Sequence, residues 1–365
     1  MLRANMLRFS RFALPAALAA VLLVVSSGVA AQRVEGDRAS ASGAFSAEVP
    51  VNSQAEGDRG AAMARALAQV LAKQTGDRGV TGRPGVGQEL RRAKDYASRF
   101  DYRQDEGVSA SGAPSFRTTL VVEFDADKVG ELINTLGLPV WPQPRPKPVL
   151  WLAIDDGKGA RLVGLNQSNA AKPVLERATQ RGYKLGLPSG NAAEQAVVGA
   201  IWRGDSAAVA RASARYSPPM QLIGKLYRND KAGWKADWIF VDDGKVLNKW
   251  SSEEADARRA MAAGADGAAD ALTRRYSKAA KGAGPAGRYR VTVTGIDSTN
   301  DFLRLAGYLQ KEAVVRRITP VRASADSLVL ELELVSGLAG FKRSIEGDGV
   351  LDPVGDADAT VYRLR

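Results

Sequence analysis

The sequence predicts a mixed α/β and α+β protein built from three small domains. Segments with apolar residues every three or four positions, typical of helices, alternate with short β-branched and aromatic runs that are typical of strands. Residues 138–148 and 278–287, rich in proline or glycine, interrupt the pattern and indicate linkers. They separate stretches at residues 32–137, 149–277 and 288–365. The length of 365 residues agrees, because it exceeds what one ordinary core holds.

The N-terminal domain is expected to be a small α+β unit. Its order is strand, helix, helix, strand, strand, helix, at residues 45–51, 58–73, 88–99, 100–104, 116–124 and 126–136. Of these, the helix at 58–73 has the clearest apolar period, and Gly76 is well suited to end it.

The central domain is expected to be α/β with a mixed sheet. The unbroken apolar run at 149–154 indicates a strand buried on both faces, and a helix and a strand at 170–182 and 183–187 predict a parallel pair. The remaining elements are helices near 191–201 and 205–215, strands at 220–227, 234–241 and 245–251, and a helix capped by residues 251–254.

The C-terminal domain reads strand, helix, strand, strand, helix, strand. These elements lie at residues 288–293, 298–309, 314–322, 327–334, 337–346 and 359–363. That order is the split βαβ pattern of a ferredoxin-like domain.

Residues 1–31 have the form of a Sec-type signal peptide. Arginines at positions 3, 8 and 11 precede an apolar run at 12–25, and Val29 and Ala31 fit the −3 and −1 positions of a cleavage site after Ala31. We therefore expect a periplasmic protein, soluble or peripheral to a membrane. No second apolar run is long enough to span a membrane.

The composition removes most familiar catalytic chemistry. The chain contains no cysteine and no histidine, which excludes disulfides, thiol nucleophiles, histidine-based triads and histidine metal sites. We expect no enzyme activity, no cofactor and no metal, although carboxylate pairs and metals held by oxygen remain open. The net charge of +11 indicates either an ordinary soluble surface with excess lysine and arginine or attraction to anionic lipid or glycan partners or to acidic proteins. Nucleic acid is not expected, because export separates the chain from it.

A few residues stand out as candidate contacts. Trp141, Arg145 and Pro146 lie in the first linker, where an aromatic side chain either pins two domains together or meets a partner. Asp155 and Asp156 follow the first strand of the central domain, where two carboxylates form either a turn or a site for Ca²⁺ or Mg²⁺.

Other features have both a structural and a ligand-binding interpretation. Residues 186–191 precede a helix and serve either to cap it or to bind an anion. The cationic cluster at 274–281 either complements a helix dipole or contacts a polyanion. The tryptophans fill cores or line a groove for a peptide or glycan, at positions 141, 151, 202, 234, 238 and 250.

Several of these segments together resemble an exported proteobacterial family catalogued as domain of unknown function 2066. They are residues 65–76, 100–102, 124–132, 136–141 and 145–152. The resemblance implies export and no particular activity. More loosely, residues 214–224 with the two following tryptophan-bearing strands resemble the periplasmic domain of the curli secretion channel and outer-membrane activators of penicillin-binding proteins.

Three functional hypotheses follow. The first is a non-enzymatic envelope-assembly or scaffold protein that binds envelope proteins. The second is a binding module for an envelope glycan or an anionic lipid. The third is a histidine-free hydrolase that uses carboxylates.

Overall fold

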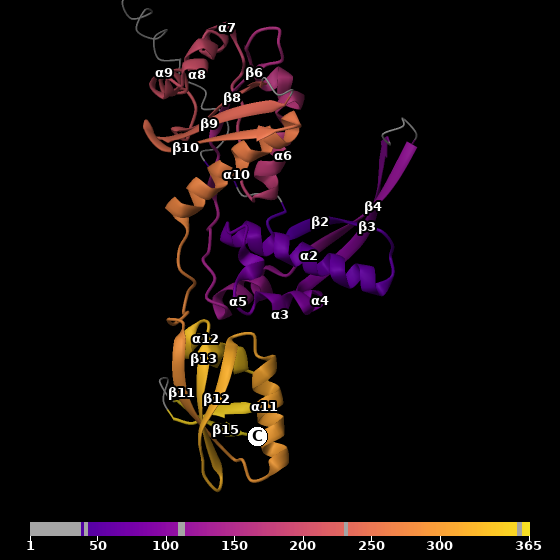
Figure 1. Cartoon of the computed structure of the whole chain (residues 1–365), viewed down its shortest axis with the longest axis vertical. Coiled ribbons are helices and arrows are strands. Elements are labelled where there is room, and N and C mark those ends of the chain that lie inside the picture. The colour runs from indigo at the N-terminus through magenta and orange to yellow at the C-terminus, as the bar shows by residue number, and fades with distance from the viewer. Residues whose placement is uncertain (1–37, 40–42, 109–113, 230–232, 356–359) are drawn as a thin grey trace, which may run out of the picture.

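The computed structural model describes residues 38–39, 43–108, 114–229, 233–355 and 360–365. Helices and strands alternate through these ranges, which confirms the mixed α/β and α+β class. The elements gather into three bodies along the long axis of the molecule, with residues 43–136 in the middle (Figure 1). The segment expected to be a signal peptide lies outside the described residues.

The N-terminal body is a three-stranded antiparallel sheet packed on a long helix. The strands β2 (Ser46–Val51), β4 (Pro114–Phe124) and β3 (Ala97–Val108) lie in that order, and α2 (Glu56–Thr75) covers one face. Gly76 ends α2 in the left-handed region, as expected. The shorter elements are η1 (Val80–Gly82), α3 (Val86–Arg91), α4 (Ala93–Tyr96) and α5 (Ala126–Thr135).

Two expectations for this body need correction. The single helix expected at 88–99 is two short helices that meet at Arg92. The second ends at Tyr96, because β3 begins at Ala97. The strand expected at 100–104 runs on to Val108 and forms with β4 a hairpin that projects from the body (Figure 1). We call this projecting part of β3 and β4 the arm.

The central body is a mixed five-stranded sheet with helices on both faces. The strand order is β10 (Lys245–Glu254), β9 (Trp234–Asp242), β8 (Met220–Arg228), β6 (Val149–Asp155) and β7 (Arg161–Leu162). One face packs against α6 (Ser168–Gln180) and α10 (Ala257–Tyr276). The other face packs against α8 (Val198–Arg203) and α9 (Ser206–Ala212), over β6 and β8. The remaining helices are η2 (Leu165–Gln167) and α7 (Ala192–Gln195).

Two details of the central body differ from expectation. The parallel neighbour of β6 is β8, and the strand expected at 183–187 is reduced to a parallel bridge at Gly186. Residues 251–254 continue β10 rather than capping a helix, and Asp256 is the N-cap of α10. Residues 251–254 resemble a capping box in sequence, but they pair with β9 and are therefore extended.

The C-terminal body contains the expected split βαβ unit. Strand β13 (Ser327–Leu334) lies between β11 (Gly287–Thr294) and β12 (Val315–Ala323) and is antiparallel to both, while α11 (Thr299–Lys311) joins β11 to β12. After α12 (Gly337–Ile345) the chain adds β14 (Leu351–Pro353), which was not expected. The terminal strand β15 (Val361–Leu364) pairs with β14 and runs parallel to β11.

The N-terminal body contacts both neighbours. Its buried apolar residues are continuous with those of the C-terminal body in one cluster, whereas the two faces of the central sheet form separate clusters. Toward the central body, Arg181 is 4% exposed, donates to the carbonyl of Gly76 and pairs with Asp266 and Asp270. In the described part of the chain, no helix is long and apolar enough to cross a membrane.

Candidate functional site

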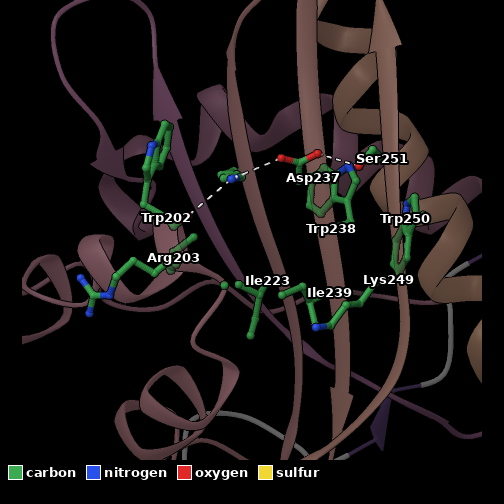
Figure 2. A pocket seen from close by; sticks show the side chains of 12 residues that line it. Trp202, Arg203, Ile223, Asp237, Trp238, Ile239, Lys249, Trp250 and Ser251 are labelled. Carbon is green, nitrogen blue, oxygen red and sulfur yellow. Dashed lines mark hydrogen bonds and ion pairs between the residues drawn. The ribbon is translucent and has the colours of Figure 1, made fainter.

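A pocket opens on the half of the central sheet that α8 and α9 leave uncovered. Its wall is formed by β8, β9 and β10, and its other side by the end of α8 (Figure 2). The cavity volume is about 320 Å³, which is at the lower end of the range for small-molecule sites.

A row of polar side chains crosses the three strands in the wall of this pocket. Strand register places Lys225 beside Asp237, and Asp237 beside Ser251. The Asp237 carboxylate accepts from Ser251 Oγ at 2.6 Å and pairs with Lys225 Nζ at 3.3 Å. It also accepts from the Tyr227 hydroxyl at 3.1 Å. The side chains of Lys225 and Asp237 are each 27% exposed, so they are accessible from the cavity but only partly solvated.

These contacts keep Asp237 ionised. Burial alone raises the pKa of its carboxyl, but hydrogen bonds from Ser251, Tyr227 and Lys225 outweigh burial, and the pKa lies below its ordinary value. The carboxylate is therefore an acceptor at neutral pH rather than a general acid.

Aromatic rings flank the lysine of the row. The rings of Trp202 and Tyr227 lie 5.9 Å apart, and Lys225 Nζ is 5.9 Å from the first centroid and 5.6 Å from the second. Lys225 also donates to the carbonyl of Trp202 at 3.4 Å, which ties the end of α8 to the sheet. The position of the pocket wall is thus fixed by cation–π and hydrogen-bond contacts together.

The remaining part of the pocket combines an apolar floor with two free cations. Ile223 and Ile239 are cross-strand neighbours on the same face and form the floor. Lys249 on β10 lies beside the floor. Arg203, at the end of α8, is at the rim, with its guanidinium pointing away from Ile223 and Ile239 (Figure 2). Within the residues that the structure describes, no acidic group pairs with either cation. A ligand with one negative group and an apolar face would match this arrangement.

The three tryptophans of β9 and β10 pack on the face of the sheet opposite the cavity. Trp238 is 1% exposed and stacks on Trp250, with ring centroids 6.5 Å apart, on the α10 side. Trp234 packs against the same cluster, as its four-residue spacing from Trp238 predicts. Core filling therefore describes these three rings, and Trp202 alone among the tryptophans faces the polar row.

The three linker residues lie inside the molecule. Trp141 and Arg145 are each 1% exposed, and Pro146 is buried in β5 (Arg145–Pro146), which pairs with β1 (Arg38–Ala39). The Arg145 guanidinium stacks on Trp141 at 3.9 Å. These contacts fit the alternative in which the linker pins two bodies together.

The Asp155 and Asp156 carboxylates are occupied by local partners. Asp155 accepts from the backbone amides of Gly157 and Gly159, and Asp156 pairs with Arg161 at 2.9 Å. This is the turn interpretation of the acidic pair. No cluster of three acidic side chains that could hold a metal ion occurs in the described part of the chain.

Residues 186–191 form a cap rather than an open anion site. Asn191 accepts from the Glu194 amide, and the buried Glu194 carboxylate accepts from the Tyr216 hydroxyl at 2.5 Å and from the Gly190 amide at 2.6 Å. At the other end of the domain, Arg275 of the cationic cluster pairs with Asp242 at 2.9 Å.

Sequence reasoning missed the pocket as a site. Its polar residues occupy alternate positions of β8, β9 and β10, and such alternation normally indicates only a solvated sheet face. The packing of α8 on the sheet places Arg203 at the same pocket as Lys249, which no spacing in the sequence reveals. The signal that could have been used is Lys225 and Tyr227 two residues apart on a strand next to Asp237.

Comparison with known families corrects the expected resemblance. The model of a different family, Domain of unknown function (DUF8605), matches residues 39–142, and nothing points to domain of unknown function 2066. The residues behind the mistaken resemblance include buried positions such as Leu67, Val70 and Leu136, which any helix packed on a sheet requires. No curated protein matches this chain at a significant level.

Proposed function

We propose that this protein is a non-enzymatic, exported binding protein of the cell envelope whose central pocket holds an anionic glycan. The observation that carries the proposal is the apolar floor with Lys249 beside it and Arg203 at the rim of the same pocket, two cations that have no acidic partner among the described residues. The chemistry they suit is a carboxylate or phosphate group attached to a ring with an apolar face.

The polar row supplies the second half of the recognition. Sugar hydroxyls need both donors and acceptors. The exposed Ser251 hydroxyl oxygen offers an acceptor beside the floor, since its proton is donated to Asp237, and the Lys225 ammonium retains a third N–H as a donor. A phospholipid head group shares the negative charge but presents few hydroxyl groups for this row. The row therefore favours a glycan over a lipid surface.

The pocket gives no support to the hydrolase hypothesis. Asp237 is the single acidic residue among those that line it, and its oxygens already accept from Ser251, Tyr227 and Lys225. Hydrolysis by paired carboxylates needs a second acid across the cleft, and one of the two must be protonated.

The test measures binding by the double variant Arg203→Ala/Lys249→Ala. Uronic-acid oligosaccharides and vesicles containing phosphatidylglycerol are the two probes, titrated against the purified chain by calorimetry. We expect the wild type to bind the oligosaccharide and the double variant to bind it at least tenfold more weakly. The matched control is Arg258→Ala/Arg259→Ala, which removes two exposed cations at the start of α10 and should leave affinity unchanged.

Other results would overturn the proposal in distinct ways. Binding to the vesicles alone would assign the pocket to anionic lipid. Binding that is equally weakened in both double variants would indicate general attraction to a basic protein. No binding to either probe would remove the pocket as an anion site.

The scaffold hypothesis remains the second candidate, and a specific observation favours it. Arg145, buried in the linker, joins the first two bodies through backbone carbonyls of both, with Nη1 to Gly182 at 2.6 Å and Nη2 to Lys73 at 2.7 Å. A protein that only bound a small ligand in one body would not need its modules held in a fixed arrangement. Photo-crosslinking in cells from Phe116, which is 67% exposed on the arm, would capture a discrete envelope protein if this hypothesis holds. Adducts no different from those of a label at the exposed Glu131 on α5 would remove it.

A further inference from the structure

The outer strand of the arm has a free edge. In the three-stranded sheet β3 is an edge strand, and its closely packed neighbour among the described elements is β4. Strand β2 stops at the pair Val51–Thr118, so the arm beyond this point is a two-stranded ribbon. An edge strand of this length presents a row of unpaired backbone groups that other strands can pair with.

The free edge carries charged side chains and has a bulge at its base, but the segment from Phe100 to Glu106 contains no bulge and no proline. The Tyr102 amide points to this edge and donates to the carboxylate of its own neighbour Asp101 at 2.7 Å. Phe100 is 43% exposed on the same strand. The irregularity of the ladder lies at Ala97–Arg99, at the base of the strand, so the segment from Phe100 to Glu106 is regular. A second strand could therefore pair along this segment.

The charges on this strand alternate in sign at every second residue. Arg99, Asp101, Arg103 and Asp105 lie on one face of the sheet, the face opposite α2, because the buried Val122 and Leu120 stand across from Phe100 and Tyr102 on the other. An antiparallel copy of the strand with Tyr102 at the centre sets Arg99 opposite Asp105 and Asp101 opposite Arg103. A twofold axis then repeats both pairs.

Registers centred one residue to either side lose this match. Centring on Asp101 sets that residue against its own copy and Arg99 against Arg103. Centring on Arg103 sets Asp101 against Asp105. Like charges directly opposite each other destabilise a sheet, and opposite charges stabilise it by about 0.2–1 kcal/mol a pair. Shifts of two residues keep part of the match, with Arg99 opposite Asp101 about Phe100 and Arg103 opposite Asp105 about Gln104. The register about Tyr102 therefore gives the largest number of opposite-charge pairs.

We propose that β3 is a dimerisation edge, and that two copies of this chain pair antiparallel through it about a twofold axis at Tyr102. The two three-stranded sheets then form one continuous six-stranded sheet. Asp101, which has no ion pair among the described residues, gains a neighbouring guanidinium from Arg103 of the second copy. In each copy Arg103 also pairs with Glu48 and Asp105 of its own chain. An isologous contact of this kind closes on itself and gives a dimer rather than a filament.

The first test compares molar mass in solution by light scattering for the wild type and Asp101→Arg. The variant places arginine at positions 99, 101 and 103 on one face of the strand. In the proposed dimer, position 101 of each copy then faces Arg103 of the other, so arginine opposes arginine at both central pairs. We expect a dimer for the wild type and a monomer for Asp101→Arg. The control Glu131→Arg makes a similar change at an exposed site on α5 and should remain dimeric. A monomeric wild type, or an Asp101→Arg variant that stays dimeric, would overturn the proposal.

The second test determines the register by crosslinking between single introduced cysteines, which is possible because the chain has no native cysteine. Tyr102→Cys should be joined to its copy by a short bis-maleimide, because the two positions face each other across the axis. Phe100→Cys alone should not be, because its copy is four residues along the strand, roughly 13 Å away. A mixture of Phe100→Cys and Gln104→Cys chains should crosslink as a heterodimer. Crosslinking of Phe100→Cys to itself, or none at Tyr102→Cys, would contradict the register.

Discussion

At the scale of single residues, Arg145 shows how a buried cation is accommodated without a carboxylate. Its guanidinium donates to the carbonyls of Gly182, Lys73 and Trp141 at 2.6–2.7 Å. The Lys73 carbonyl belongs to the last turn of α2, and Gly182 lies two residues past the end of α6, so both carbonyls are at helix C-termini, where helix dipoles place negative charge. Burial lowers the pKa of Arg145 to about 9, so the group is still charged at neutral pH.

The planar fork of arginine is what this site requires. Arg145→Lys keeps the charge but cannot reach three carbonyls at once, and it loses the stacking on Trp141. We expect the free energy of unfolding to fall by about 2–4 kcal/mol, measured by urea denaturation. Arg83→Lys is the control, since that side chain is 53% exposed and should change stability by less than about 0.5 kcal/mol. Equal midpoints for both variants would show that the carbonyl contacts contribute nothing.

At the scale of elements, glycines on two neighbouring elements make room for a buried ring. A Cβ at Gly224 on β8 would lie 2.2 Å from the Trp238 ring, and one at Gly264 on α10 would lie 2.5 Å from it. The ring is therefore held between strand and helix. This packing sets how closely α10 approaches the sheet whose other face carries the pocket.

Alanine substitutions at two helix glycines distinguish the effect of side-chain packing on stability from the effect of helix propensity. Alanine is favoured over glycine in a helix by about 1 kcal/mol, so Gly307→Ala on α11, with open space around it, should stabilise the protein. Gly264→Ala gains the same propensity but clashes with Trp238, and we expect a net loss of about 1–3 kcal/mol. Thermal unfolding of both variants measures the difference. Stabilisation by Gly264→Ala would show that the ring moves aside easily.

The sequence predicts the bounds of the central strands better than it predicts which segments they contact. Strands β8 and β9 lie within a residue of expectation, since alternating and β-branched runs mark them. The start of α10 was misplaced, because Ser251 reads locally as a cap but donates to Asp237 in the sheet. The pocket was not predicted for a similar reason, because only tertiary packing places Arg203 of α8 and Lys249 of β10 at the same pocket. Contacts between distant segments are what a single sequence conceals.

At the scale of the whole molecule, the N-terminal body connects the pocket-bearing body to the C-terminal body. Arg78 pairs with Asp270 of α10 on one side, at 3.0 Å. On the other side Ser336 donates to the carbonyl of Thr135, and a Cβ at Gly85 would lie 2.4 Å from the carbonyl oxygen of Ala313. Each contact joins backbone or charged groups, so the three bodies are held at defined places rather than tethered by linkers alone.

The second of these interfaces contains a pH-sensitive carboxyl. Glu312 precedes Ala313 and lies near Glu89 of α3 and near Asp348. Burial raises the pKa of Glu312 above its ordinary value of 4.5, and Asp348 and Glu89 add to the rise, although a hydrogen bond from Ser344 opposes it. The folded protein therefore holds this proton more tightly than the unfolded chain. Its contribution to stability is complete below pH 4.5 and is lost as the pH rises through the folded-state pKa.

Glu312→Gln should remove this dependence, because a neutral amide resembles the protonated carboxyl. We expect the melting temperature of the variant to exceed that of the wild type at about pH 8 and to equal it at about pH 4. Asp352→Asn is the control, because that exposed carboxylate pairs with Arg365 away from the interface and should show no such gain at high pH. A constant difference between Glu312→Gln and wild type across the pH range would mean that Glu312 does not titrate at the interface. Convergence at low pH would show that ionisation of one side chain weakens the contact between the N-terminal and C-terminal bodies.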